Sequence, residues 1–148
     1  MAKKINSPLW YDLALDERGV KVTHDNPKVL AYYADSGFKD VRHDSVPWCA
    51  AFVGAMLHRA GVEPSGSLMA RSYLKWGTKL KAPKHGCVVV FSRPGSSFLG
   101  HVAFFDHSVG DQVMVFGGNQ SHRVSFGLFP KSRVLGYRWP NLEEIVHG

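Results

Sequence analysis

Helical and strand patterns occupy separate parts of this 148-residue chain. In its first half, apolar side chains recur at the three- and four-residue steps of amphipathic helices, whereas residues 87–137 contain alternating and β-branched runs bounded by turn residues. Helices that precede strands in this way favour an α+β fold over alternating βαβ units. We therefore predict N-terminal helices packed on a C-terminal antiparallel β-sheet.

Start and stop signals give the expected helices their limits. Asn26-Pro27 is a capping residue followed by a proline suited to the first turn, and Gly37 supplies a stop. A loop over residues 38–46 then leads into a helix that begins at Cys49. The expected helices cover residues 9–17, 27–36, 49 to the stop at Gly61, and 67–76.

Composition fits one compact domain spanning residues 1–148. Hydrophobic residues make up 45% of the chain and charged residues 20%, which is sufficient for an ordinary core. No apolar span reaches transmembrane length, and no repeat or low-complexity tract is present. We expect a monomer without stable membrane insertion.

Cys49 is the first candidate for chemistry. Downstream apolar residues at helical spacing, Phe52, Val53, Met56 and Leu57, place Cys49 in the first turn of its helix. Unpaired backbone N–H groups and the helix dipole favour an anion there, so a thiol ionises more easily. A thiolate nucleophile also needs a proton shuttle, and histidine is the usual residue.

His101 is the candidate base, because a predicted hairpin brings it to a polar partner. Residues 100–107 and 112–118 have strand composition, and a three-residue loop over 109–111 would place His101 opposite Asn119. The Asn119 side chain would then orient the imidazole. A loop with an even number of residues would instead bring Gly118 or Gln120 opposite, because a one-residue slip reverses the face. Gln120 is therefore the reserve orienting residue.

Each of these residues also has a structural interpretation. A cysteine on the apolar side of a helix is most often a small buried hydrophobe, and His101 is one of eight histidines. Asn119 follows Gly117-Gly118, a context typical of turns. The combination of helix-start thiol, strand histidine and nearby amide nevertheless favours a nucleophile, a base and an orienting residue.

The chain resembles the CHAP/NlpC superfamily of cysteine peptidases and amidases in several segments. These are residues 46–53 (VPWCAAFV), 86–91 (GCVVVF), 100–105 (GHVAFF) and 117–120 (GGNQ), with a closing strand over 132–140 similar to a phage-associated branch. The resemblance implies a papain-like fold and a substrate in the peptide part of bacterial peptidoglycan. It matches Cys49 to the nucleophile, His101 to the base and Asn119 to the orienting residue.

The expected function is hydrolysis of a peptidoglycan amide bond by a phage endolysin. Stem-peptide endopeptidases and N-acetylmuramoyl-L-alanine amidases share this machinery, so both activities stay open. The N-terminus is basic but lacks an apolar signal region, so we expect the protein in the host cytoplasm. Release through a holin-type pore, or injection as an antibacterial effector, would then bring it to the periplasm or cell wall.

Two further positions complete the expected site, and a third departs from the family pattern. Trp48 is either a core anchor or a wall of the substrate groove, and Gln120 would also line that groove. Cys87 departs from the family pattern, which commonly has an acidic residue after this glycine. Because Cys87 begins a β-branched run, we predict a buried and unreactive thiol.

The net charge of +6 and the pI near 9.5 would draw the protein to anionic polymers such as cell-wall material or nucleic acid. Four lysines gather near two aromatic residues, an arrangement also seen in nucleic-acid surfaces. No nucleic-acid motif accompanies them, so we favour a solvated face and expect no nucleic-acid partner. The residues concerned are Lys75, Lys79, Lys81, Lys84, Tyr73 and Trp76.

Rival functions remain open at this stage. A zinc hydrolase could draw ligands from His43, Asp44, His101, His107 and His122, but no zinc-binding motif is present. We expect no metal and no other cofactor. A non-enzymatic wall-binding module would leave Cys49 merely packed. A lysozyme requires a placed pair of carboxylates, which the four glutamates do not suggest.

Overall fold

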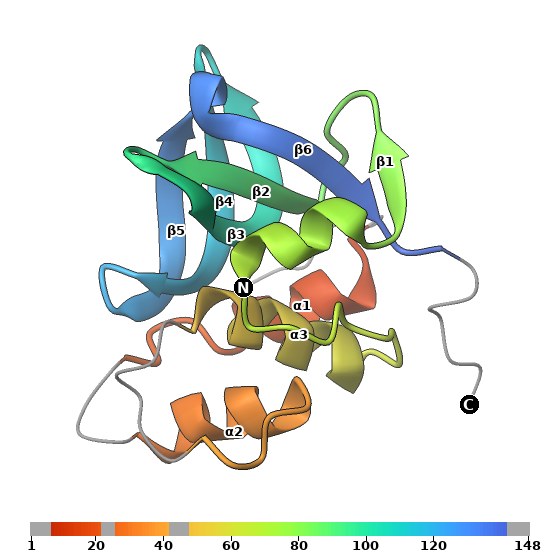
Figure 1. Ribbon diagram of the computed structural model, residues 1–148, viewed down its shortest axis with the longest axis vertical. Coiled ribbons are helices and arrows are strands. Elements are labelled where there is room, and N and C mark those ends of the chain that lie inside the picture. Colours follow the sequence, from red (N-terminus) through yellow and green to blue (C-terminus); the bar gives the residue numbers. More distant parts are fainter. Residues whose placement is uncertain (1–6, 22–25, 42–47, 142–148) are drawn as a thin grey trace.

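A computed structural model describes residues 7–21, 26–41 and 48–141, and it places the helices on one side of a curled β-sheet (Figure 1). The prediction of an α+β fold, with the Cys helix packed on an antiparallel sheet, is confirmed. The elements are α1 (Leu9–Leu15), α2 (Pro27–Asp35), α3 (Cys49–Arg59), η1 (Ala70–Lys75), β1 (Thr78–Leu80), β2 (Val88–Arg93), β3 (Ser96–Val109), β4 (Gln112–Gln120), β5 (Arg123–Pro130), η2 (Lys131–Arg133) and β6 (Val134–Trp139).

The six strands follow the order β1-β6-β2-β3-β4-β5, and neighbouring strands run antiparallel. Alternation along β2 divides its side chains between two hydrophobic clusters. Val88 and Val90 pack with the helices, whereas Val89 and Phe91 pack in a second cluster on the other face. Because both faces of this strand are covered, its sequence is a continuous apolar run.

Two of the predicted N-terminal helices form nearly where expected. In α2 the Asn26 side chain accepts a hydrogen bond of 2.9 Å from the backbone N–H of Lys28, and Pro27 occupies the first turn. This helix ends at Asp35, one residue early. Helix α1 ends at Leu15, two residues before the predicted limit.

The segment predicted as a helix over residues 67–76 is instead a shorter 3₁₀ helix, Ala70–Lys75. Two serine hydroxyls compete for its leading backbone N–H groups. Ser67 Oγ accepts from the N–H of Met69 at 3.0 Å, and Ser65 Oγ accepts from the N–H of Ser67 at 3.4 Å. Such local bonds offer the backbone an alternative to helix. The edge strand β1, which pairs with β6, was not predicted.

The hairpin that carries His101 also differs from the prediction. Its loop is the two-residue turn Gly110-Asp111, with Val109 paired to Gln112, so the predicted three-residue loop is wrong. A bulge at Asp106 then shifts the register by one residue. Beyond the bulge, Phe104 pairs with Phe116, which is the register that the three-residue loop would have produced.

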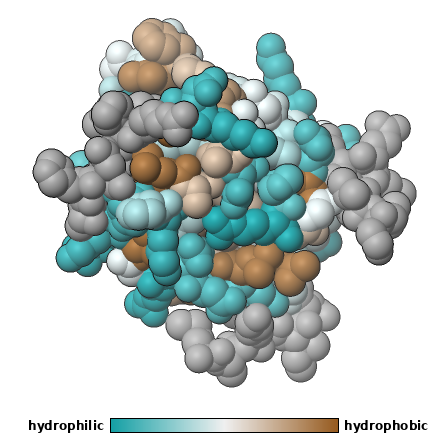
Figure 2. Space-filling model, turned by 90° about the horizontal axis from the view of Figure 1, so that it is seen from below, coloured by the Kyte–Doolittle hydropathy of each residue, from teal (hydrophilic) through white to brown (hydrophobic). Residues whose placement is uncertain are grey.

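Several surface expectations concern the described residues. The aromatic side chains of Tyr73 and Trp76 are buried, so they do not form an exposed stacking surface with the neighbouring lysines. Viewed from below Figure 1, apolar side chains appear in small groups separated by hydrophilic ones (Figure 2). None of the described helices combines the length and the hydrophobicity that crossing a lipid bilayer requires.

Candidate active site

Cys49 begins α3 and is buried, with 7% of its surface exposed. The preceding Trp48 is only 1% exposed and stacks on Tyr32, with ring centroids 6.0 Å apart. A Cβ atom at Gly118 would lie 2.8 Å from the Trp48 ring and 2.6 Å from Phe52 Cβ. Glycine at this position therefore lets β4 approach the start of α3, and Trp48 is a core anchor rather than a wall of the groove.

His101 lies on β3, and Gln120, at the end of β4, holds its side chain. His101 Nε2 and Gln120 Oε1 are 2.9 Å apart. The amide nitrogen Nε2 of Gln120 donates to the backbone carbonyl oxygen of Ser125 at 2.6 Å. In return, Ser125 Oγ donates to the backbone carbonyl oxygen of Gln120 at 3.1 Å. The Gln120 side chain is thus fixed at both ends.

This arrangement also sets the tautomer of His101. Because a carbonyl oxygen only accepts hydrogen bonds, the amide nitrogen of Gln120 must face Ser125 and its Oε1 must face His101. His101 Nε2 therefore carries a hydrogen. The remaining ring nitrogen, Nδ1, is left for the hydrogen bond between His101 and the Cys49 thiol.

The orienting bond thus comes from the reserve residue Gln120, and the expected Asn119 does not form it. Asn119 has a φ of 58°, and the β4–β5 pairing is irregular between Gly117 and Gln120. A left-handed residue interrupts the two-residue alternation of a strand, so the residue after it extends toward His101. Asn119 instead lines the cavity in front of Cys49 and His101. The Gly-Gly-Asn run was the available signal for this break.

Electrostatics favour ionisation of Cys49. Burial by itself raises the pKa of the Cys49 thiol, but the hydrogen bond and positive charge of His101 act against burial. The backbone N–H groups of Val102 and Ala50 also donate to the sulfur, and the pKa is lowered overall. The Ala50 N–H belongs to the first turn of α3, where it has no partner within the helix.

The pKa of His101 moves in the opposite direction. Burial lowers the pKa of its imidazole, but the hydrogen bond and negative charge of Cys49 raise it more, and Gln120 adds to this. Arg133 has a smaller lowering effect. The pKa is raised overall, so the thiolate and the imidazolium stabilise each other.

Sequence reasoning missed an aromatic stack behind His101. The Phe129 ring lies parallel to the imidazole at a centroid distance of 5.1 Å, and Phe91 stacks on Phe129 at 4.6 Å. The guanidinium carbon of Arg133 lies over the Phe129 ring, 5.4 Å from its centroid. These residues come from three strands and a 3₁₀ helix, so no local pattern links them.

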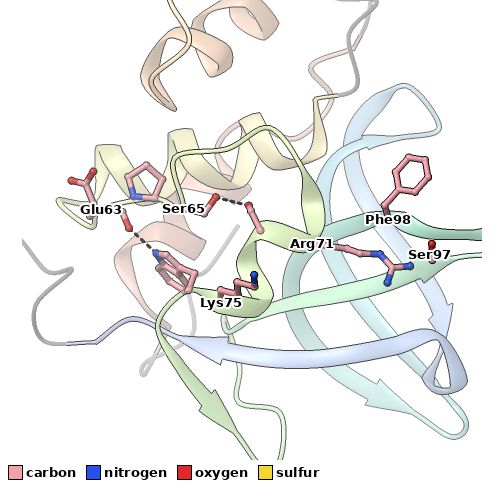
Figure 3. A pocket seen from close by; sticks show the side chains of 9 residues that line it. Glu63, Ser65, Arg71, Lys75, Ser97 and Phe98 are labelled. Carbon is pink, nitrogen blue, oxygen red and sulfur yellow. Dashed lines mark hydrogen bonds between the residues drawn. The ribbon is translucent and has the colours of Figure 1, made fainter.

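Two cavities meet at His101. The first, of about 210 Å³, is lined by Cys49, Leu68, Met69, Ala70, Arg93, Leu99, Gly100, His101 and Asn119. The second, of about 390 Å³, lies on the Gln120 side and shares Arg93, His101 and Asn119 with the first. A larger cavity of about 760 Å³ lies beside η1 and contains neither Cys49 nor His101 (Figure 3). The two smaller cavities, which contain Cys49 and His101, therefore form the candidate active site.

The zinc alternative has no ligand set in the described part of the chain. Its residues 7–21, 26–41 and 48–141 contain no group of three or more His, Cys, Asp or Glu side chains arranged to hold a metal ion. His107 instead contacts the neighbouring Asp106 carboxylate at 2.6 Å. His43 and Asp44 lie outside the described residues.

Comparison with known proteins agrees with this geometry. A family model described as "CHAP domain" matches residues 41–119, just over half of the chain. The matched range contains Cys49, His101 and Asn119, and it ends one residue before Gln120. No curated protein matches the chain. The CHAP match suggests peptidoglycan hydrolysis of the amidase or peptidase type, and by this match the chain belongs to the CHAP domain family.

Proposed function

We propose that this protein is a cysteine-dependent peptidoglycan hydrolase that cleaves an amide bond in the peptide part of the cell wall. One observation carries the proposal: a thiol with a lowered pKa shares a hydrogen bond with an imidazole that Gln120 orients. A cavity opens directly onto this pair. A merely packed cysteine would need neither the oriented histidine nor the cavity.

In the first half of the reaction, the Cys49 thiolate attacks the carbonyl carbon of the scissile amide. The carbonyl oxygen becomes an oxyanion, and the backbone N–H of Cys49, in the first turn of α3, stabilises it. The His101 imidazolium then gives its Nδ1 proton to the leaving nitrogen. The carbon–nitrogen bond breaks, the amine departs and a thioester remains on Cys49.

In the second half, neutral His101 accepts a proton from water through Nδ1. The resulting hydroxide attacks the thioester carbon, and the Cys49 thiolate leaves as the carboxylic acid product departs. Throughout both steps, Gln120 keeps the imidazole oriented by accepting from Nε2–H, and Asn119 lines the space that the substrate enters. The role of Gln120 replaces the orienting role first assigned to Asn119.

In the cell, the proposed role is that of a phage endolysin acting as a monomer on bacterial peptidoglycan. The protein would accumulate in the host cytoplasm and reach the wall after release through a holin-type pore. An injected antibacterial effector with the same site is the alternative delivery. The similarity of residues 132–140 to a phage-associated branch supports the endolysin role.

The decisive experiment is digestion of purified peptidoglycan by the wild type and by Cys49→Ala, with mass spectrometry of the released fragments. New amino ends without new reducing sugar ends, seen only with the wild type, are expected. The fragment masses then distinguish an endopeptidase from an N-acetylmuramoyl-L-alanine amidase. Equal cleavage by both proteins would exclude Cys49 as the nucleophile, and no cleavage of several wall types by either would favour a binding module.

A further inference from the structure

The two cavities that meet at His101 carry positive charge. Their described lining residues include two arginines, Arg93 and Arg133, and no aspartate or glutamate. Arg93 lines both cavities, so it lies where a substrate would pass from the Cys49 side to the Gln120 side. A cavity with cationic groups and no nearby carboxylate is suited to an anionic ligand.

Arg93 is available to such a ligand. Its side chain is exposed, and its guanidinium has no hydrogen bond or ion pair with any other described residue. Pairing moves from Ser92–Gly100 directly to Arg93–Ser96, so residues 97–99 of β3 bulge opposite the end of β2 that carries Arg93. Bulges beside functional sites commonly redirect a side chain, and this one accompanies the exposure of Arg93 at the cavities.

The bulged segment is held in place from η1. Arg71 Nε donates to the carbonyl oxygen of Leu99 at 2.8 Å, and its Nη2 donates to that of Ser96 at 3.0 Å. Figure 3 shows the Arg71 side chain extending toward the start of β3, near Ser97 and Phe98. These two hydrogen bonds fix the backbone opposite Arg93. Ligand binding therefore costs less conformational entropy.

Arg133 lies in the second cavity, and its orientation is also set by the protein. Its Nε and Nη2 atoms donate to the carbonyl oxygen of Ser92 at 3.0 and 2.7 Å, and its guanidinium lies over Phe129. Ser92 directly precedes Arg93. Arg133 is therefore anchored to the residue that precedes Arg93, beside the stack that supports His101.

We infer that Arg93, with Arg133 beside it, binds a carboxylate of the substrate next to the scissile amide, so that the enzyme selects acidic peptides. The inference rests on the proposed function and specifies its substrate. Peptides carry their negative charge as carboxylates, and a guanidinium binds a carboxylate through two parallel hydrogen bonds. Converting that carboxylate to a carboxamide removes the charge while keeping the shape nearly the same.

The test measures binding in the Cys49→Ala background, where no turnover occurs. The probes are two cross-linked muropeptides that differ only in whether their stem carboxylates are free or converted to carboxamides. Isothermal titration calorimetry should show about tenfold tighter binding of the free acid. Adding Arg93→Gln should reduce this preference to nearly one, whereas Arg93→Lys should keep part of it.

Lys28→Gln is the matched control, because Lys28 is an exposed cation on α2 that lines neither cavity. It should leave the preference unchanged, and thermal melts should show that all variants fold. No preference in Cys49→Ala, or a preference that survives Arg93→Gln, overturns the inference. Hydrolysis by the wild type is measured separately, so failure of the carboxylate site and failure of the proposed catalysis give different results.

Discussion

The two cysteines of this chain have the same side chain and similar burial, but their surroundings differ. Cys87 is fully buried among Val89, Phe91 and Phe105, and burial raises the pKa of its thiol to about 12. Cys49 is 7% exposed, yet its pKa is lowered. Burial acts on both thiols in the same direction, so the groups that donate to the sulfur make the difference. Of the two thiols, Cys49 is the one that bonds to a histidine of the described residues.

Both cysteines are free thiols, and the prediction that Cys87 is buried is confirmed. The position of each in its element explains the contrast. Cys87 directly precedes β2, and its backbone groups pair with Lys84 and Phe105. Cys49 occupies the first turn of α3, where N–H groups have no partner within the helix. Burial in an apolar cluster protects the Cys87 thiol, whereas a helix start beside a histidine activates that of Cys49.

Replacing each cysteine in turn tests the comparison most directly. Cys49→Ala should reduce peptidoglycan hydrolysis by about 10⁴-fold or more, because the nucleophile is lost. Cys87→Ala should keep hydrolysis within about threefold and lower the free energy of unfolding by about 1–2 kcal/mol, since it leaves a small cavity. Fragment release and urea unfolding measure the two effects. A large loss of hydrolysis in folded Cys87→Ala would contradict the assignment.

Substitution of Gln120 tests whether the orientation of the His101 imidazole matters for catalysis, in addition to its position beside Cys49. Gln120→Ala should lower kcat by about 10–100-fold, because Nε2 loses its acceptor and the ring is free to reorient. Asn119→Ala should have a smaller effect, because Asn119 lines the cavity without bonding to His101. Steady-state kinetics on a soluble muropeptide measure both. A larger effect at Asn119 would restore the orienting role expected from the sequence.

Alkylation by iodoacetamide should distinguish the two thiols, because their pKa values differ. Because the pKa of Cys49 lies below its ordinary value of 9.0 and that of Cys87 lies near 12, Cys49 alone should react in the folded protein at neutral pH. Peptide mapping identifies the modified residue. His101→Ala should slow the reaction of Cys49, and unfolding in guanidinium should make both cysteines reactive. Rapid labelling of Cys87 in the native protein would disprove its burial.

The pH profile of kcat/KM should form a bell. Activity falls at low pH as the Cys49 thiolate is protonated. Because the pKa of Cys49 is lowered, the midpoint of this limb lies at a pH below 9.0. Activity falls at high pH as the His101 imidazolium loses its proton. Because the pKa of His101 is raised, the midpoint of that limb lies at a pH above 6.5. Arg133→Gln should shift the high-pH limb further upward, because the charge of Arg133 lowers the pKa of His101. A downward shift would contradict this electrostatic coupling.

Local sequence patterns were sufficient for the starts of α1, α2 and α3 and for the general layout. Asn26-Pro27 caps α2 as predicted, and the apolar repeat after Cys49 defines α3. Patterns failed where side chains competed with backbone structure. The serines before η1 shortened the predicted helix, because their hydroxyls bind backbone N–H groups.

The β3–β4 hairpin shows why register could not be derived from the loop alone. The loop prediction was wrong by one residue, and the bulge at Asp106 compensated for it. Asn119 then adopted a left-handed conformation, which transferred the bond with His101 to Gln120. Bulges and left-handed residues depend on packing between strands, so composition indicated only that this region was irregular.

The sequence by itself determined the α+β class, the helix-start position of Cys49 and the strand position of His101, because periodicity and capping act over a few neighbouring residues. Tertiary structure alone decided that Gln120 orients the imidazole, that Trp48 is a core anchor and that Arg93 and Arg133 line one cavity with His101. These contacts join segments far apart in the chain. Their geometry depends on how the sheet curls and how closely Gly118 of β4 allows the start of α3 to approach.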